Sequence, residues 1–252
     1  MRKKRCLITG SSKGLGKALV QKFKSEGYET IGVSRSYDEC VDICISTDLS
    51  EYKSVDVILQ NLQGHIDVFV CNAGINMSGA FDSSPFENIA KTMQTNLILP
   101  MMLMQAFVRH KIFEKEASCI WISSLASSLS YPGSSVYGAS KKGLSDFVEQ
   151  IEMIVNSDLH QMTVYPGPMD TLQALQNTPS AGQKKSWAKT DVVAEKIFRG
   201  MQSRNRYLYP ARGLWFLAKV VGVYPYLGEK IMDKTVWEPM KKKAREQKTL
   251  AL

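Results

Sequence analysis

The feature that most constrains the fold of this 252-residue chain is a glycine-rich turn near its N-terminus, between an apolar strand and an apolar helix. Residues 6–8, Cys-Leu-Ile, predict a short buried strand, and the turn 9–16, Thr-Gly-Ser-Ser-Lys-Gly-Leu-Gly, follows at once. Apolar residues then recur at helical spacing, at Ala18, Leu19, Val20 and Phe23. Such glycines let the backbone approach a phosphate, and the helix N-terminus offers free N–H groups to an anion. The segment therefore predicts nucleotide binding, with an ordinary strand–helix turn as the alternative.

Apolar runs alternate with helical stretches along the rest of the chain, which predicts a parallel sheet covered by helices on both faces. The expected strands are residues 6–9, 30–34, 42–46, 67–72, 119–123, 163–165 and 206–209. Ser84 and Pro85 are expected to cap and begin one of the helices. We thus expect an α/β fold, a three-layer doubly wound parallel sheet (Rossmann fold) of about seven strands.

Six residues stand at or just after the ends of predicted strands, namely Thr9, Ser34, Asp48, Asn72, Ser124 and Pro166. Ligands of open parallel sheets bind beyond the carboxyl ends of the strands. These residues therefore predict one shared cleft.

Composition narrows the class of protein further. The length suits one large α/β domain, and from the sequence we expect neither a secretory signal nor an apolar run of spanning length. The five cysteines form no metal or redox pattern, and Cys6, Cys71 and Cys119 are expected to be buried packing residues. We expect a reducing, cytoplasmic location. The net charge of +8 comes with no nucleic-acid motif, so we expect no nucleic-acid partner.

Tyr137 and Lys141 lie four residues apart in the segment Tyr-Gly-Ala-Ser-Lys. Side chains at positions i and i+4 share one face of a helix. The unperturbed pKa of a tyrosine hydroxyl is about 10, and a neighbouring ammonium group would lower that pKa towards neutrality. The pair therefore predicts an acid–base catalyst, with an exposed helix face as the alternative.

Five motifs in this order resemble the short-chain dehydrogenase/reductase family, in its compact single-domain branch. They are the turn Gly10-x3-Gly14-x-Gly16, Asn72-Ala73-Gly74, Ser124, the pair Tyr137 and Lys141, and Pro166-Gly167 with Thr171. The spacings agree as well, with 24 positions from Asn72 to Asn96 and 13 from Ser124 to Tyr137. The resemblance covers roughly residues 5–210. We expect residues 1–210 to form the catalytic domain and residues 211–252 a C-terminal extension packed on it or on a partner subunit.

The resemblance implies a nicotinamide cofactor along the carboxyl edge of the sheet. Its contacts would be Gly10, Ser12, Lys13, Gly14, Leu15 and Gly16 in the turn; Ser34 and Arg35 after the second strand; Asp48 and Leu49 beside the adenine; Asn72, Ala73 and Gly74 on the cleft floor; Tyr137 and Lys141; and Pro166, Gly167, Met169 and Thr171 beside the nicotinamide. A purely structural turn is the alternative for residues 72–74.

The residues after the second strand predict which cofactor is preferred. An acidic residue there would bind a free ribose 2′-hydroxyl and repel a 2′-phosphate. This chain has Ser34-Arg35-Ser36 instead, with Lys13 in the glycine turn as a second cation. Arginine binds phosphate through two parallel hydrogen bonds. We therefore expect NADP(H) to be preferred over NAD(H), with two solvated surface charges as the alternative.

The family's chemistry assigns roles to four catalytic residues. Ser124 would donate a hydrogen bond to the substrate carbonyl oxygen, with the adjacent Ser123 as the alternative. Tyr137 would give its proton to that oxygen as hydride arrives, and would act as the base in reverse. Lys141 would lower the tyrosine pKa and hold the ribose hydroxyls. Asn96 would anchor a water that resupplies protons, or would only bond a distorted helix turn.

The substrate is expected to be a small carbonyl or alcohol compound. The segment 172–189 would close its pocket, and Leu172, Leu175 and Trp187 would line the pocket or merely pack the segment. A catalytically silent NADP(H)-binding regulator and a nucleotide-sugar epimerase or dehydratase are the rival functions. The second rival would have a differently spaced glycine turn and a larger C-terminal domain.

Two expectations concern partners. The resemblance implies a homodimer or homotetramer, in which the apolar faces Leu97-Leu103-Phe107 and Leu144-Phe147-Ile151 would pair, although they would equally suit an internal core. The tail combines the apolar run 214–221 with the basic run 241–245. Peripheral contact with a membrane through this tail is the less favoured alternative to packing over the cleft or a neighbouring subunit.

Overall fold

The computed structural model describes residues 2–76, 81, 84–129, 133–155, 158–171, 187–211, 213, 216, 220–221 and 224–238. Most of the predicted pocket segment 172–189, of the apolar run 214–221 and the whole basic run 241–245 lie outside this part of the chain. Trp187 is described and is half-buried.

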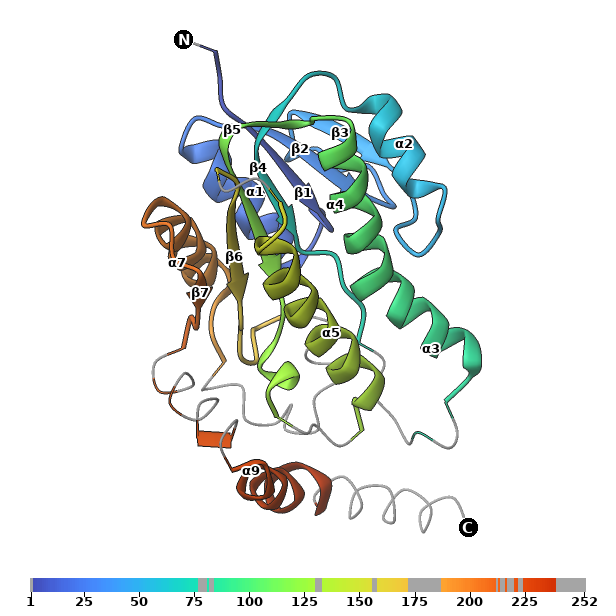
Figure 1. The fold of residues 1–252 in the computed structure, drawn as a ribbon, viewed down its shortest axis with the longest axis vertical. Helices are drawn as coiled ribbons and strands as arrows, with labels where there is room; N and C mark the ends of the chain where they lie inside the picture. The colour runs from blue at the N-terminus through green and yellow to red at the C-terminus, as the bar shows by residue number, and fades with distance from the viewer. Residues whose placement is uncertain are drawn as a thin grey trace.

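A seven-stranded sheet forms the centre of the molecule (Figure 1). Its strands are β1 (Arg5–Thr9), β2 (Glu29–Ser34), β3 (Ile43–Ser46), β4 (Ile66–Cys71), β5 (Phe113–Ile122), β6 (His160–Val164) and β7 (Tyr207–Leu208). They are hydrogen-bonded in the order β3-β2-β1-β4-β5-β6-β7, and every pair is parallel. This arrangement confirms the predicted doubly wound sheet and its seven strands.

Helices cover both faces of the sheet (Figure 1). The helices along the chain are α1 (Gly14–Ser25), α2 (Ser54–Asn61), α3 (Phe86–Met93), α4 (Leu99–Arg109), α5 (Ser135–Glu152) and α7 (Thr190–Gln202), with a π-helical turn η2 (Gln94–Ile98) between α3 and α4. Helix α9 (Pro225–Met232) lies below the sheet in Figure 1 and covers neither face. Helices α1 and α7 pack on one face, and α2, α4 and α5 pack on the other. No helix in the described residues is long and apolar enough to cross a membrane.

Alternate residues of each strand supply two separate cores. In β1, Leu7 faces the core beneath α4 and α5, whereas Cys6 and Ile8 face the core beneath α1 and α7. The first core contains Phe69 with Phe107 and Trp121, whose rings meet edge to face at centroid distances of 5.2 and 5.7 Å. Strands buried on both faces require near-continuous apolar runs, and these runs are why the strands could be predicted from the sequence.

The apolar faces of α4 and α5 belong mostly to the core of this single chain. Leu103, Phe107, Leu144 and Ile151 are buried in the first core, and Leu97 and Phe147 pack against it. Of the two alternatives for these faces, the internal core is therefore the one observed.

Several boundaries differ from the sequence expectation, among them the starts of α3 and β5. Helix α3 begins at Phe86, so Pro85 occupies the cap position and Ser84 lies one residue outside it. Strand β5 begins at Phe113, six residues before the expected start. Its first half carries exposed charges and a residue with positive φ, Glu116 (φ 60°), and its pairing with β4 shifts register, so the apolar signal appears only near Cys119.

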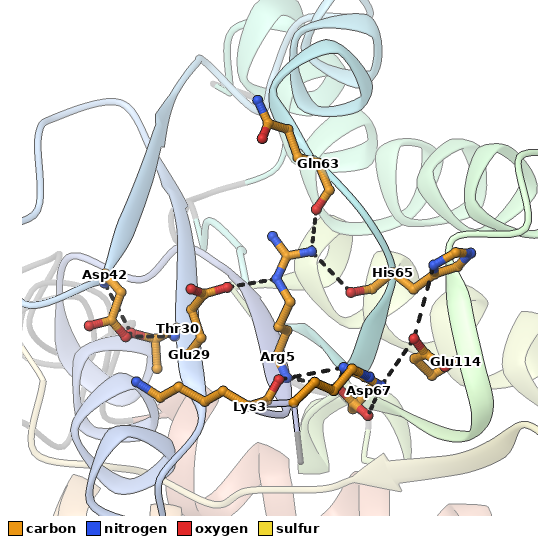
Figure 2. Close-up of polar contacts among 10 residues, drawn as sticks. Lys3, Arg5, Glu29, Thr30, Asp42, Gln63, His65, Asp67 and Glu114 are labelled. Carbon is orange, nitrogen blue, oxygen red and sulfur yellow. Dashed lines mark hydrogen bonds and ion pairs between the residues drawn. The ribbon is translucent and has the colours of Figure 1, made fainter.

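Charged residues join the amino ends of the central strands (Figure 2). The Arg5 side chain binds Glu29 at 2.7 Å and also donates to the carbonyl oxygens of Gln63 and His65. Asp67 accepts hydrogen bonds from the Arg5 backbone amide at 2.7 Å and from the Arg2 guanidinium at 2.7 and 2.9 Å. These contacts fix β1 against β2 and β4 at the end opposite the predicted cleft.

Candidate active site

Helix α5 carries both members of the predicted catalytic pair. Tyr137 is half-buried, and Lys141, one turn further on, is only 3% exposed. The Lys141 Nζ donates to the carbonyl oxygen of Ile122, the last residue of β5, at 2.7 Å. The lysine thus reaches from the helix to the carboxyl end of the sheet, where the cleft was expected.

Burial changes the proton affinity of both side chains. Desolvation lowers the pKa of Lys141 to about 8, and the nearby Cys71 thiol opposes this change. Desolvation raises the pKa of Tyr137 above its ordinary value, and a hydrogen bond with the Ser124 side chain opposes that rise. The expectation that the Tyr137 pKa is lowered is therefore wrong for the free protein. Burial of the phenol dominates, and the Lys141 ammonium group is directed to a carbonyl oxygen.

The two neighbouring serines at the end of β5 have different surroundings. Ser124 is half-buried, shares a hydrogen bond with Tyr137, and accepts one from the Ala126 amide at 3.1 Å. Ser123 is buried, donates to the Lys141 carbonyl oxygen at 3.1 Å, and lies 2.8 Å from the Ser145 hydroxyl. Ser123 is thus occupied in joining β5 to α5, and Ser124 is the serine beside the phenol.

Asn96 lies in the π-helical turn η2 and is completely buried. Its side-chain oxygen accepts a hydrogen bond from the Ile75 amide at 2.9 Å, and its side-chain nitrogen donates to the Ile75 carbonyl at 2.9 Å. The same nitrogen donates to Ser140 on α5 at 3.0 Å. The side chain therefore holds the segment after β4 rather than its own helix turn.

Asn72 joins the ends of β4 and β1. Its side-chain nitrogen donates to the carbonyl oxygens of Thr9 and Gly10, at 2.9 and 3.1 Å. The Thr9 hydroxyl in turn accepts from the amides of Asn72 and Ala73. These bonds close the floor of the site, where Ala73 and Gly74 are half-buried. The sequence indicated Thr9 only as a strand-end residue, and the structure shows that its hydroxyl also binds the Asn72 and Ala73 amides at the floor of the site.

The glycine turn is shaped so that an anion can approach it. Gly10 and Gly14 have positive φ values of 68° and 52°, which glycine adopts without strain. A Cβ atom on Gly16 would lie 1.9 Å from the Gly10 carbonyl oxygen, so only glycine allows α1 to start so close to the turn. Among the described residues no side chain caps α1, and its first turn holds no acidic residue. Its first amides and its dipole therefore suit a phosphate group.

Further predicted contacts surround this turn. Leu15 is buried, Ser12 is half-buried, and Lys13 is exposed. The Ser11 hydroxyl is buried without a hydrogen-bond partner in the described residues. The glycine turn thus combines the buried Ser11 hydroxyl, two glycines with positive φ and the uncapped N-terminus of α1. This combination fits the binding of a dinucleotide.

The ends of β2 and β3 carry the residues expected near the adenosine. Ser34 is buried and donates to the Ser36 carbonyl at 2.5 Å, while Arg35 is exposed. Asp48 accepts from the amide and hydroxyl of Ser50, and these bonds together with the charge of Arg35 hold its pKa below the usual value, against a smaller effect of burial. Leu49 is buried in the core.

The segment after β6 reaches the same site. The Pro166 carbonyl accepts from the Leu125 amide at 3.2 Å, beside Ser124. A Cβ atom on Gly14 would lie 3.2 Å from the Thr171 side chain, so this segment meets the glycine turn. Met169 forms a bridge with Ala188, and Gly167 is half-buried between these contacts. The predicted catalytic and cofactor-binding residues are thus all described, and they lie along the carboxyl edge of the sheet, whereas the predicted pocket residues Leu172 and Leu175 lie outside the described part of the chain.

Ser140 and Ser145 were missed by sequence reasoning. Both are buried on α5 and hydrogen-bond to groups from other elements, Ser140 to Asn96 and Ser145 to Ser123. Both serines lie on the buried face of α5, and this position could have indicated that they bond to other elements, since a buried serine requires a hydrogen-bond partner. The structure shows no cluster of metal-ligating side chains in the residues it describes.

Comparison with known proteins agrees with this geometry. The model of the short chain dehydrogenase family matches residues 4–181 of this chain. The chain belongs to this family. An uncharacterized oxidoreductase of Schizosaccharomyces pombe is 31% identical over 199 residues, which are 72% of this chain and 68% of the relative.

Other short-chain dehydrogenase relatives carry more specific names. A 3-ketodihydrosphingosine reductase of Bacteroides thetaiotaomicron is 27% identical over 66% of this chain and 64% of its own length, so this chain spans less than two thirds of that relative. Among solved structures, one from Sphingobium yanoikuyae in complex with NADPH has a TM-score of 0.74 at 18% identity, covering 89% of this chain and 94% of that one. Another, from Burkholderia phymatum in complex with NAD, has a TM-score of 0.76 at 20% identity, with coverages of 89% and 95%. These structures show the shared fold.

Proposed function

We propose that this protein is an NADPH-dependent oxidoreductase that interconverts a carbonyl group and a secondary alcohol. The observation that carries the proposal is the grouping of a half-buried Tyr137, hydrogen-bonded to Ser124, with a buried Lys141 one turn away. Family membership and relatives named as ketoacyl or 3-oxoacyl reductases support this choice of reaction.

Tyr137 is the general acid of the proposed reduction. A phenol with a raised pKa is fully protonated at neutral pH, so it can donate a proton to an oxygen that gains charge. Ser124 donates a hydrogen bond to the same oxygen and holds the carbonyl group against the phenol. Bound NADPH would supply the hydride.

Lys141 supports this proton transfer from within the protein. Its ammonium group has a pKa of about 8, so it is mostly protonated at neutral pH and can still exchange protons near working pH. It donates to the Ile122 carbonyl, and an ammonium group has three hydrogens, so it can also donate to a ribose hydroxyl. We propose that Asn96 orders the solvent that returns protons to Lys141.

The cofactor preference follows from charge. Lys13 and Arg35 are exposed cations at the two sides of the adenosine region, and the β2 end at Ser34-Arg35-Ser36 has no carboxylate. We propose that they bind the 2′-phosphate of NADP(H). Solved relatives hold NADPH in one case and NAD in another, so the preference rests on these residues.

Three further properties complete the proposal. Residues 1–210 form the catalytic domain and residues 211–252 a C-terminal extension. The five cysteines are free thiols, which fits a cytoplasmic location. The protein assembles as a homodimer or homotetramer. Light scattering during size-exclusion chromatography measures the mass of the assembly and tests this directly.

The decisive experiment measures NADPH oxidation with four carbonyl classes: ketones, aldehydes, 3-oxoacyl thioesters and keto sugars. We expect turnover with at least one class, and we expect Tyr137→Phe to abolish it while NADPH binding persists. Turnover by Tyr137→Phe near the parent rate would exclude Tyr137 as the acid. Tight NADPH binding without turnover of any class would favour a catalytically silent regulator.

A further inference from the structure

Ser140 is a fully buried serine that lies on α5 between the two residues of the proposed catalytic pair. Its hydroxyl donates to the Tyr137 carbonyl oxygen at 2.7 Å and accepts from the Asn96 side-chain nitrogen at 3.0 Å. One side chain therefore connects the backbone that carries Tyr137 with a residue 44 positions earlier in the chain.

Asn96 extends this connection to the floor of the site. Its amide group binds both backbone polar groups of Ile75, each at 2.9 Å. The side-chain nitrogen has two hydrogens, and Ile75 and Ser140 accept one each. Ser140 therefore fixes the orientation of the amide, because the second hydrogen has no other acceptor among the described contacts.

The position of Gly74 shows why this orientation matters. A Cβ atom on Gly74 would lie 3.2 Å from the Lys141 Nζ and 3.3 Å from the Asn96 side-chain oxygen. The Gly74 backbone is thus packed between the ammonium group and the amide. A shift of Asn96 would move this backbone relative to the Lys141 Nζ.

We propose that Ser140 is a positioning residue that acts through Asn96 to hold the Gly74–Ile75 backbone against Lys141 and Tyr137. This inference rests on the proposed function, since it assigns Ser140 a part in the chemistry of that site. A serine that bonds only its own helix, three residues back, is common in helices and would affect stability alone. The bond to Asn96 distinguishes Ser140 from that case, because it crosses between two elements.

The first test replaces Ser140 with alanine in the full chain. We expect Ser140→Ala to lower kcat about 10-fold with little change in the KM for NADPH, because misplaced reacting groups slow the chemical step more than binding. Ser118→Ala is the matched control, since Ser118 is also buried and hydrogen-bonded, to His160, at the opposite end of the sheet. The control should keep kcat while losing a similar amount of stability.

A double-mutant cycle tests whether Ser140 acts through Asn96. If it does, Ser140→Ala combined with Asn96→Ala should be no slower than Asn96→Ala alone. Additive losses in kcat would overturn the proposal. Ser140→Cys keeps the side-chain size with a weak hydrogen-bonding group, so it serves in the same cycle should the alanine variant unfold at the assay temperature.

Hydrogen exchange at the Ile75 amide gives a result that does not depend on turnover. We expect Ser140→Ala to reduce the protection of this amide about 10-fold or more, because its acceptor on Asn96 is no longer fixed. The Ser118→Ala control should leave it unchanged. Unchanged protection with parent-like kcat in Ser140→Ala would overturn the inference and leave the proposed function standing. If the parent protein turns over no substrate but Ser140→Ala still loses protection at the Ile75 amide, the proposed function is overturned. The contact between Ser140 and Asn96 would then still position Ile75.

Discussion

At the amino ends of β1, β2 and β4, cations and carboxylates are paired near the surface, whereas at the carboxyl ends a buried ammonium group donates to a backbone carbonyl. Arg5 lies 2.7 Å from Glu29 at the first end, and Arg2 lies 2.7 Å from Asp67. At the other end, no carboxylate pairs with Lys141 in the described part of the chain, and burial lowers its pKa to about 8. One end of the sheet is therefore built for stability, and the other holds a charge whose burial opposes folding.

The largest effect that would sharpen this contrast is expected at Lys141. Lys141→Met should lower kcat about 10³-fold, because the proposed proton transfer and the proposed ribose binding both lose their ammonium group. It should not lower the free energy of unfolding at pH 7, because a buried charge without a carboxylate partner is replaced by an apolar side chain of similar length. Urea denaturation and NADPH oxidation measure the two quantities. If Lys141→Met loses stability as well as activity, the buried charge of Lys141 does not oppose folding.

The pH dependence of stability measures how strongly the buried charge of Lys141 opposes folding. The Lys141 pKa is about 8 in the folded protein and 10.5 in a model peptide, so below pH 8 both states carry the proton and the burial penalty is fully present. Between pH 8 and 10.5 the folded protein releases its proton first, so stability rises with pH. Relative to Lys141→Met, the parent should gain about 3 kcal/mol across this interval. A difference that stays flat would show that Lys141 has an ordinary pKa.

A smaller effect is expected at the amino end. Asp67→Ala should lower the free energy of unfolding by about 2 kcal/mol, because the Arg5 amide and the Arg2 guanidinium lose their acceptor. Activity should stay at the parent level. The matched control is Asp146→Ala on α5, which removes an exposed pair with Lys142 and should cost at most about 0.5 kcal/mol. Equal losses in the two variants would refute the importance of the amino-end contacts.

The smallest effect is expected for the exposed Arg35. Arg35→Ala should raise the dissociation constant for NADPH about 10-fold and leave that for NADH nearly unchanged, because only NADPH carries the 2′-phosphate. Stability should not change. Lys115→Ala, an exposed cation near the amino end of β5, is the control and should alter neither constant. Titration of cofactor fluorescence measures both, and parallel weakening of NADPH and NADH would remove Arg35 from the phosphate site.

The sequence predicted the sheet well because its strands are apolar on both faces and end at polar residues. Six of the seven strand starts lie within three residues of their expected positions, and β5 is the exception because its charged first half has no continuous apolar run. Motif spacing assigned Ser124, Tyr137 and Lys141 to one candidate site, since they lie close together in the chain, and that assignment stays a prediction.

Contacts between distant segments could not be predicted. The bonds from Asn96 to Ile75 and Ser140 join three separate segments, and no local pattern indicates which groups meet. The pKa of Tyr137 was also wrongly expected, because helical spacing gives the distance between two side chains but not their burial. No sequence pattern singled out His160 either, and it is buried and bonded to Ser118 and the Asn205 carbonyl.

The strand order β3-β2-β1-β4-β5-β6-β7 also bears on how the chain acquires its shape during synthesis. After β1, every strand that leaves the ribosome pairs with one made earlier: β2 and β4 flank β1, β3 pairs with β2, and β5, β6 and β7 add outward in turn. No strand has to be inserted between two that are already paired. The sheet can therefore grow from the first strand outward while translation proceeds, without rearrangement of pairs already formed.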